Sequence, residues 1–521
     1  MASIVERLRS PTHQVFWLIF IYALYLHRVL GMDGFFDTEN YHYYLGWMGA
    51  NFRAYEDGAL AQYHTFLNPI ADIINYTLFE LHPYIGALYH AAILAGCGAL
   101  VFRILLLVSP DPRSTFYDAI ALPGAVIMGL SATMTVTQFG SWGNEHITAL
   151  FLLASIYCVL LFYTKDQAKH LILAGVFCGI AAALKLTSLP SVLVICLTIA
   201  LIGRKRFKLV FMAGAATLGA FLVLDAPYMI ARAVQTGNPI FPVANGVFAS
   251  ELIIEEQPSF NPLQLEQIWI YLTLPWQWLT TATFSENADT RDGRMLLAFI
   301  GIGCTAFAMA RGRKQGKHDP FLLLIFMFLA TWVCWLLIAR IWRYLIVWEM
   351  LTGVLFFVGL WRALGDGKTL AKGAAIASAM ALLFTTTTYP DWGRRAWTSD
   401  FVHSNIPDLK LAETGVTHAY LMERQLSILS EYIAHDGIRL LAAQAHPDFV
   451  GDRQFSPLDP VHFGDPIDGD PVFITRAQTD VRELIPSLTE RYPYEVYEFV
   501  CAESTDTLWL NPFVCRFRPA S

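Results

Sequence analysis

The sequence has few charged residues for its length. Of its 521 residues, 15% are Asp, Glu, Lys or Arg, while 55% are hydrophobic and 14% are aromatic. A soluble globular chain carries about 25% charged residues. The composition therefore excludes an ordinary soluble enzyme, and the net charge of -7 gives no reason to expect nucleic acid as a partner.

The N-terminus has no small-residue cleavage site of the A-x-A kind. The short segment MASIVERLRSPTH, with Arg7 and Arg9, leads into an apolar run from Gln14 to about Gly31. This run is longer than the apolar core of a typical signal peptide. We therefore predict that it is retained as the first membrane span.

Cysteines are few, and none is spaced with histidine as in a zinc site. Six of the eight lie in apolar runs, where cysteine usually acts as a small apolar residue. These six are Cys97, Cys158, Cys178, Cys196, Cys304 and Cys334. Cys501 and Cys515 lie in the polar C-terminal region. In an oxidising compartment we expect a purely structural disulfide between them.

Long apolar runs, in contrast, recur along most of the chain. A run of about 20 apolar residues can cross the hydrocarbon core of a bilayer as a helix. The sequence predicts a polytopic all-α membrane protein with about 11 transmembrane helices. The spans lie near residues 14–31, 84–108, 119–137, 147–163, 170–187, 189–203, 209–227, 294–310, 320–339, 344–361 and 370–388.

The distribution of Lys and Arg predicts the orientation of these spans. If the N-terminus is cytoplasmic, the inside segments hold most of the basic residues before the final domain, including RKRFK at 204–208 and RGRKQGK at 311–317. Two long loops, 32–83 and 228–293, then face outward. In the first, the bulky residues from Tyr41 to Phe52 recur at helical spacing, which predicts an interfacial helix. We expect a multi-pass protein of the cell inner membrane, with residues 1–389 as its transmembrane module.

Residues 390–521 differ in composition from the rest of the chain. They are polar and rich in Pro and Asp, and the strand-like runs GIRLLAA, PVFITR and YEVYEFV alternate with helical stretches around 422–435 and 479–490. This pattern predicts a small C-terminal extracytoplasmic α/β domain attached to the last span.

Ionisable residues near the ends of spans mark a candidate site, because charge at membrane depth is costly and is usually functional. In the predicted topology these residues share one level, the outer membrane–water boundary. They are Asp37, Glu39, His42, Glu145, His146, Lys185, Asp225, Arg340 and Arg343. A transporter more often places such groups near the bilayer midplane. A site at the boundary instead suits a substrate that is half lipid and half polar.

The residue types predict a phosphate site beside a general base. Lys185, Arg340 and Arg343 can bind a lipid phosphate or pyrophosphate, Arg through its bidentate fork and Lys as a point charge. A nearby carboxylate, with Asp37 favoured, can take a proton from an acceptor hydroxyl. Departure of the phosphate from an anomeric carbon makes this glycosyl transfer from a polyprenyl-linked sugar.

Structural roles remain open for these residues at this stage. The alternative role of Lys185 is merely to snorkel to the interface. The alternative role of Arg340 is to set the orientation of its span. Asp225 can simply cap or pair locally, and His42 can be a hydrogen-bonded structural histidine.

Four short motifs, in order, resemble those of a known superfamily. They are FFDTENYHYY at 35–44, GIAAALKLTSLP at 179–190, GNPIFPVANGVF at 237–248 and RIWRYLIVWEML at 340–351. With the exported C-terminal domain, this layout resembles the GT-C superfamily of membrane glycosyltransferases. That superfamily includes protein O-mannosyltransferases, aminoarabinose transferases and oligosaccharyltransferases.

The resemblance implies a polyprenyl-phosphate sugar donor, inversion at the anomeric carbon and a general base in the first outside loop. Asp37 matches the base, Glu39 is a second acid that orients the acceptor, and Lys185 and Arg343 match donor-phosphate positions. Glu286 loosely matches a second acidic element. No cofactor is required by the resemblance. The acid-x-acid spacing of Asp37 and Glu39 leaves a divalent cation, Mg or Mn, as an option.

Other functions stay open. A lipid-linked glycan ligase or polymerase should carry basic residues in its late outside loop, and loop 228–293 has few. A flippase or transporter should carry charge deep in several spans, where His90 and Glu349 are the candidates. An inactive scaffold is a third alternative. The sugar, the length of the lipid carrier and the acceptor, whether a glycan, a lipid or a protein, are not determined by the sequence.

Overall fold

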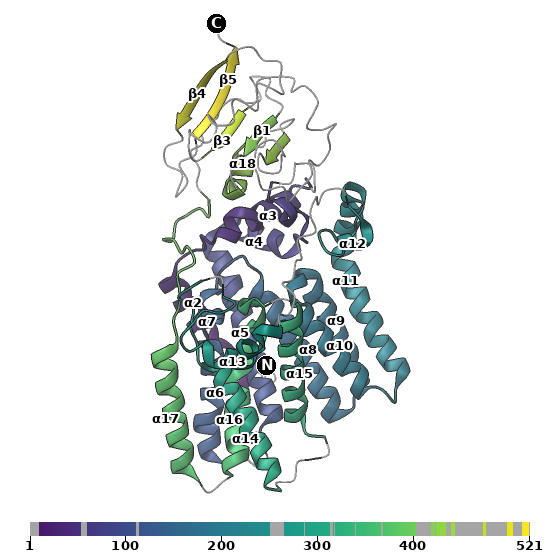
Figure 1. Ribbon diagram of the computed structural model, residues 1–521, viewed down its shortest axis with the longest axis vertical. Helices are drawn as coiled ribbons and strands as arrows, with labels where there is room; N and C mark the ends of the chain where they lie inside the picture. Colours follow the sequence, from purple (N-terminus) through teal and green to yellow (C-terminus); the bar gives the residue numbers. More distant parts are fainter. Residues whose placement is uncertain are drawn as a thin grey trace, which may run out of the picture.

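The helices form a bundle beneath a layer of short helices, and a small sheet lies beyond that layer (Figure 1). We call the end of the bundle nearest the short helices the loop end. The computed structural model describes residues 10–53, 60–110, 114–250, 265–285, 287–312, 316, 318–338, 340–365, 368–402, 418–421, 424–433, 439–442, 472–475, 497–503 and 513–519.

Seven helices in the described part of the chain are long and apolar enough to cross a membrane. They are α2 (Pro11–Leu30), α5 (Pro83–Val108), α8 (Glu145–Lys165), α11 (Phe207–Thr236), α15 (Pro320–Ile338), α16 (Ile346–Leu364, with the preceding turn) and α17 (Thr369–Thr386). Each coincides with a predicted span. The prediction of a polytopic all-α membrane protein is confirmed.

The four remaining predicted spans coincide with shorter apolar helices. These are Tyr117–Leu130, which combines η3 (Tyr117–Ala121) and α6 (Leu122–Leu130), then α9 (Ala168–Leu184), Leu186–Ile202 and α14 (Arg294–Ala310). The third contains η4 (Leu186–Ser188) and α10 (Leu189–Ile202), with Pro190 in the first turn of α10, where its missing N–H costs no hydrogen bond. That all eleven cross the membrane stays a prediction.

Apolar side chains cover the outer faces of several of these helices. Exposed examples are Leu18 and Ile21 on α2, Phe211, Leu218 and Val223 on α11, and Leu370 and Phe384 on α17. Contiguous apolar surface of this extent is expected for helices that face lipid. Inside the bundle, α16 is buried along most of its length.

Small residues allow the central helices to approach closely. A Cβ at Gly359 on α16 would lie 2.0 Å from the carbonyl oxygen of Gly301 on α14. Close backbone contact through glycine is typical of helix packing in membranes. The α14–α16 pair therefore forms a rigid centre for the bundle.

The first long loop forms the layer of short helices. It contains η1 (Thr38–His42), α3 (Tyr43–Ala50), η2 (Gln62–Phe66) and α4 (Ile70–Leu81). The sequence predicted an interfacial helix from Tyr41 to Phe52. The helix is present as α3, but α4 and the C-terminal η8 (Arg424–Leu429) pack on it, so its aromatic side chains are buried. It does not lie open on a lipid surface.

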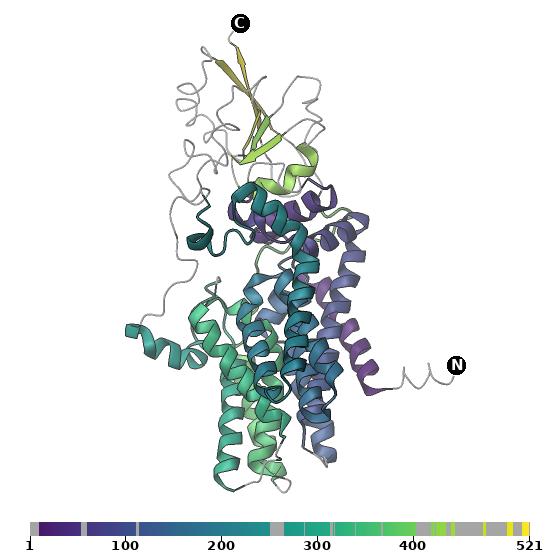
Figure 2. The same ribbon diagram turned by 90° about the vertical axis from the view of Figure 1, so that its right-hand side faces the viewer.

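The second long loop projects from the side of the bundle. It contains α12 (Asn245–Phe248), η5 (Leu265–Gln267) and α13 (Ile268–Gln277), and Figure 2 shows α13 extending sideways from the other helices. Trp269, Leu272 and Trp276 of α13 are exposed. A helix with exposed tryptophans of this kind suits the membrane interface.

The described C-terminal strands form one mixed sheet in the order β2-β1-β3-β5-β4. Strands β1 (His418–Leu421), β2 (Arg439–Ala442) and β3 (Val472–Thr475) are parallel, whereas β4 (Tyr497–Glu503) and β5 (Phe513–Pro519) pair antiparallel. Three of the five strands fall on the predicted runs. The helix α18 (Ser430–Ile433) follows η8, and the predicted helix 479–490 lies outside the described residues.

The chain that leaves α17 stays on the bundle before it reaches this sheet. Arg395 pairs through its backbone with Met32, and Arg394 donates to the carbonyl oxygens of Thr137 and Phe139 at 2.7 and 2.6 Å. The first residues after 389 are therefore a strap over the loop end, although the change in composition begins there.

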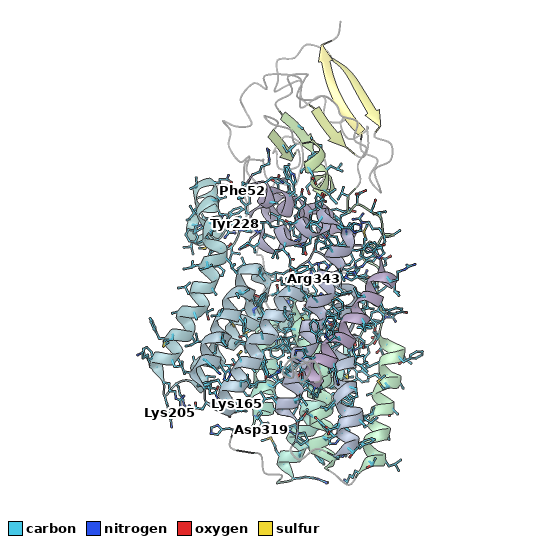
Figure 3. All side chains as sticks on the ribbon, turned by 180° about the vertical axis from the view of Figure 1, so that it is seen from behind. Phe52, Lys165, Lys205, Tyr228, Asp319 and Arg343 are labelled. Carbon is cyan, nitrogen blue, oxygen red and sulfur yellow. The ribbon has the colours of Figure 1, made fainter. Side chains whose placement is uncertain are left out.

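The opposite end of the bundle carries the segments predicted to face the cytoplasm. Figure 3 shows Lys165, Lys205 and Asp319 at that end, far from Arg343. Arg362 forms an ion pair with Asp319 there. Residues of three predicted inside segments therefore lie at the end of the bundle opposite Arg343. Which end faces the cytoplasm stays a prediction.

Candidate active site

The stretch FFDTENYHYY folds as a helix with one irregular turn. Residues 38–42 form the π-helix η1, whose following residue, Tyr43, donates its N–H to the carbonyl of Thr38 five residues earlier. Such single π turns are frequent at functional sites. Because a π turn aligns residues five apart, Asp37 and His42 lie on the same side of the segment.

The buried side chain of Asp33 fixes the start of this segment. Its carboxylate accepts hydrogen bonds from the Phe35 N–H at 2.9 Å, the Thr38 hydroxyl at 2.6 Å and the Trp142 N–H at 2.7 Å. Arg395 of the strap donates to the carbonyl oxygen of Asp33 at 2.7 Å. The loop before η1 is thus held by its own hydrogen bonds and by two other parts of the chain.

Asp37 forms an ion pair with Arg343, which lies 306 residues later. Nη1 of Arg343 donates to Oδ2 of Asp37 at 2.7 Å, and the two side chains are 11% and 23% exposed, respectively. Burial alone raises the pKa of the Asp37 carboxyl, but the Arg343 guanidinium, aided by His42 and Lys185, lowers it to about 2. Asp37 is therefore an anion in this state.

Stacked tryptophans hold Arg343 in place. It lies on the short helix η6 (Trp342–Leu345), where the Trp342 ring stacks on Trp278 with centroids 3.8 Å apart. The backbone N–H of Trp342 donates to the Phe284 carbonyl, and the indole N–H of Trp335 donates to the Ile341 carbonyl, both at 2.9 Å. The second long loop and α15 thus set the position of Arg343.

Glu145 and Lys185 form a second ion pair beside the first. Lys185, at the end of α9, donates to Oε1 of Glu145 at 2.5 Å and to the Gly143 carbonyl. Glu145 is the first residue of α8, where the helix dipole favours a carboxylate. A Cβ at Gly143 would lie 2.3 Å from Oε2 of Glu145, so glycine makes room for this carboxylate.

The two ion pairs are joined. Nε of Arg343 lies 3.8 Å from Oε1 of Glu145, so the charges alternate along Asp37, Arg343, Glu145 and Lys185. We call these four residues the charge cluster. They come from four segments far apart in sequence, and their charges balance. An incoming phosphate can replace a carboxylate as partner of either cation.

Glu39, predicted as a second acid, points elsewhere. Residues two apart in a helical segment do not face each other, and the Glu39 carboxylate acts on Arg395 of the strap. Burial lowers the pKa of Arg395 to about 10, with Asp33 and Glu39 opposing the decrease. Asp37 and Glu39 therefore do not converge as a metal-binding pair. Within the described residues, no group of three or more His, Cys, Asp or Glu side chains could hold a metal ion.

One further predicted residue, Arg340, is not brought into the charge cluster. Arg340 lies over the rings of Tyr271 and Phe284, at 5.5 and 5.7 Å from their centroids. Glu286 lies outside the described residues. Asp225, also singled out in the sequence, forms a buried ion pair with Arg232 at 2.6 Å.

The structure adds residues that the sequence did not indicate. Asp72 on α4 contacts both His42 and Asn144, each at 2.8 Å. Asp33 anchors η1, as described above. Neither aspartate lies in a recognisable motif, because their partners are distant in sequence. The predicted candidates His42 and Glu145 do lie at the site.

Among known proteins, similarity is found with solved structures. No protein-family model matches the chain, and no curated protein matches it. A solved structure described as the crystal structure of ArnT from Cupriavidus metallidurans bound to undecaprenyl phosphate is similar over 97% of this chain and 98% of that chain. The two share 12% sequence identity, and the TM-score is 0.43.

Proposed function

We propose that the protein is an inverting glycosyltransferase. It moves a sugar from a polyprenyl-phosphate donor to an acceptor hydroxyl at the outer face of the cell inner membrane, with its N-terminus cytoplasmic and its C-terminal domain extracytoplasmic. The observation that carries this proposal is the charge cluster at the loop end of an apolar helix bundle. The resemblance of the four motifs to GT-C enzymes supports the same function.

Lys185 and Arg343 are the proposed donor-phosphate ligands. Both cations lie at the loop end of helices whose outer faces are apolar, so a lipid chain can lie along the bundle while its phosphate meets the two side chains. Arg340, which lies outside the charge cluster over the rings of Tyr271 and Phe284, is the proposed third cation for the same headgroup. Together they can supply the positive charge that a divalent ion supplies at other phosphate sites, so the proposal needs no metal.

Asp37 is the proposed general base. A phosphate that binds Arg343 competes with Asp37 for its N–H donors, and loss of that partner raises the pKa of Asp37 from its depressed value. The bond between the anomeric carbon and the phosphate oxygen then breaks as the acceptor oxygen bonds from the opposite face. The acceptor proton passes to Asp37, and the lipid phosphate leaves with Lys185 and Arg343 as its counterions.

Charges deeper in the bundle fit a structural role better than a transport path. Glu349 on α16 accepts from the backbone N–H of Thr135 at 2.9 Å and of Met134 at 3.3 Å. His90 on α5 contacts the Asn75 side chain at 3.0 Å. Glu349 therefore has fixed backbone partners, and one ring nitrogen of His90 is held by Asn75, which favours the enzyme over a transport path.

The test is turnover of lipid-linked sugars by the purified full-length protein. Radiolabelled polyprenyl-phosphate sugars and crude envelope acceptors are incubated with wild type, Asp37→Asn and a control, Asp289→Asn, whose side chain is exposed in the second loop. We expect transfer by wild type and by the control, and a loss of about 10²- to 10⁴-fold in Asp37→Asn, the usual contribution of a general base.

The alternatives make different predictions in the same assay. Equal turnover by wild type and Asp37→Asn removes Asp37 as the base. No turnover with any donor contradicts the enzyme, and movement of labelled lipid across proteoliposomes would then identify a flippase. Absence of both activities leaves the scaffold.

A further inference from the structure

His42 has a buried carboxylate behind it. Its Nδ1 lies 2.8 Å from Oδ1 of Asp72, and Asp72 is only 1% exposed. The Asn144 amide donates to the same oxygen at 2.8 Å. Asp72 comes from α4, Asn144 precedes α8 and His42 ends η1, so three elements fix this imidazole.

The contact with Asp72 determines which nitrogen of His42 is available. A carboxylate accepts hydrogen bonds, so Nδ1 carries the hydrogen and the neutral ring keeps a lone pair on Nε2. Nε2 is buried and has no hydrogen-bond partner among the residues that the structure describes. A buried polar atom without a partner costs about 1–3 kcal/mol, so such an atom needs an explanation.

Nε2 belongs to a ring at the edge of the charge cluster. His42 follows Asp37 by five residues, the spacing of the hydrogen bonds in a π turn, and its electrostatic influence reaches both Asp37 and Glu145. Asp72 and Tyr41 contact the ring directly, and His64 stacks on Tyr41. The other ionisable groups are Asp37 and Glu145, on which His42 acts electrostatically together with Lys185 and Arg343.

Asp37 needs a second proton acceptor. While it is paired with Arg343, its pKa of about 2 prevents it from keeping a proton at neutral pH. The proton taken from the acceptor must therefore leave Asp37 before the ion pair re-forms. The lone pair on Nε2 of His42 can accept that proton. A carboxylate on its other nitrogen stabilises the imidazolium, as in the serine hydrolase triad.

We propose that His42 receives the acceptor proton from Asp37, with Asp72 as its positioning residue. The inference rests on the glycosyl transfer proposed above and adds the path of the proton. The acceptor O–H bond breaks, the proton passes to the Asp37 carboxylate and then to Nε2 of His42. The resulting imidazolium is paired with Asp72 and returns the proton to water when the products leave.

The first experiment examines the imidazole without turnover. Full-length protein labelled with ¹⁵N-histidine is studied by NMR, and His42→Gln assigns the resonance. We expect an Nδ1-protonated ring whose Nε2 signal shifts when undecaprenyl phosphate is added but not when undecaprenol is added. Asp72→Asn should remove the tautomer preference. An Nε2-protonated ring, or no response to the phosphate lipid, overturns the proposal whether or not the protein is a glycosyltransferase.

The second experiment measures the pH–rate profile with a donor that supports turnover. If His42 accepts the proton, kcat falls as the imidazole becomes protonated on acidification. His42→Gln should lower kcat by about 10²-fold and remove this acidic limb, and Asp72→Asn should displace it. The control His82→Gln changes an exposed histidine of the same loop and should match wild type.

The outcomes separate the two proposals. Turnover by wild type with an unchanged acidic limb in His42→Gln overturns the proton path and leaves the glycosyl transfer standing. A lower kcat with an unchanged limb assigns His42 a structural role and also overturns the path. Failure of wild type with every donor overturns the glycosyl transfer, and the proton path with it.

Discussion

Lys185 and Glu145 depend on each other because both are almost enclosed by protein. Their side chains are 16% and 2% exposed, and they meet at 2.5 Å. A buried ion pair adds little net stability, but removal of one partner leaves an uncompensated charge. A variant that removes both charges of the pair therefore separates the effect of Lys185 on stability from its proposed role in binding the donor phosphate.

Lys185→Met should lower the free energy of unfolding by about 3–5 kcal/mol, because it leaves the Glu145 carboxylate buried beside a weaker partner. Lys185→Met/Glu145→Gln should recover most of this stability. If Lys185 binds the donor phosphate, neither variant should bind undecaprenyl phosphate as wild type does. The measurements are thermal unfolding in detergent and lipid binding by native mass spectrometry. Full lipid binding by the stable double variant would contradict the assigned role.

At the scale of elements, the single turn η1 orients three of the predicted site residues. Its irregular hydrogen bonding turns Asp37 and His42 to the same side, while Glu39 turns toward the strap. The turn is held by the buried Asp33 and by tertiary contacts, since its own backbone pattern is uncommon.

Asp33→Ala should therefore impair the site without touching substrate. The change leaves the N–H groups of Phe35 and Trp142 and the Thr38 hydroxyl without their acceptor, and each such buried group costs about 1–3 kcal/mol. We expect a lower melting temperature and lower kcat with donor binding retained. Asp391→Ala is the matched control, because Asp391 also accepts two backbone N–H groups but is exposed. Equal losses in both variants would refute the special role of Asp33.

The elements were predictable from sequence where the signal was local. Each predicted span coincides with a helix, because a long apolar run by itself indicates a helix that can lie in the hydrocarbon core of a membrane. Lys185 and Arg343 could be singled out because charge near membrane depth is costly. Asp72 could not be, since its role arises from His42 thirty residues away. The π turn of η1 was also missed, because strap and bundle contacts impose it.

The strands β4 and β5 allow a prediction about the two C-terminal cysteines. Their register places Cys501 directly opposite Cys515 in an antiparallel pair. Opposed Cα atoms in such pairs lie about 4.5–5.5 Å apart, within the range that a disulfide spans. We expect a disulfide-linked peptide in protein purified from an oxidising compartment, detected by mass spectrometry without reduction. Two free thiols in that material would contradict it and would question the exported location.

At the scale of the whole molecule, η8 and α18 of the C-terminal region pack on the layer of short helices. The Ser427 hydroxyl of η8 lies 2.9 and 2.6 Å from the carbonyl oxygens of Glu39 and Asn40 in η1. Glu431 of α18 accepts from the hydroxyls of Tyr43 at 2.6 Å and Tyr76 at 3.0 Å. Movement of the C-terminal region would therefore disturb η1 directly.

A pair of carboxyl groups, Glu80 and Glu431, makes the contact between α18 and the layer of short helices sensitive to pH. The hydroxyl of Tyr43 lies within hydrogen-bond distance of both Glu431 and Glu80, at 2.6 and 3.0 Å, and it has one hydrogen to donate. Partial burial and the charges of Glu431 and Asp400 raise the pKa of Glu80 to about 7, opposed by the Tyr43 hydroxyl. The nearby Tyr76 also has a raised pKa.

The sign of the effect follows from the raised pKa of Glu80. A carboxyl that binds its proton more tightly when α18 packs on this layer stabilises that contact fully below about pH 4.5, and the contribution is lost as the pH rises through about 7. Hydrogen exchange of residues 38–50 and 424–433, corrected for intrinsic rates, should therefore be faster at pH 8.5 than at pH 6. Glu80→Gln, which cannot ionise, should exchange equally at both values. Equal protection of wild type at pH 6 and 8.5 would show that the contact does not depend on this proton.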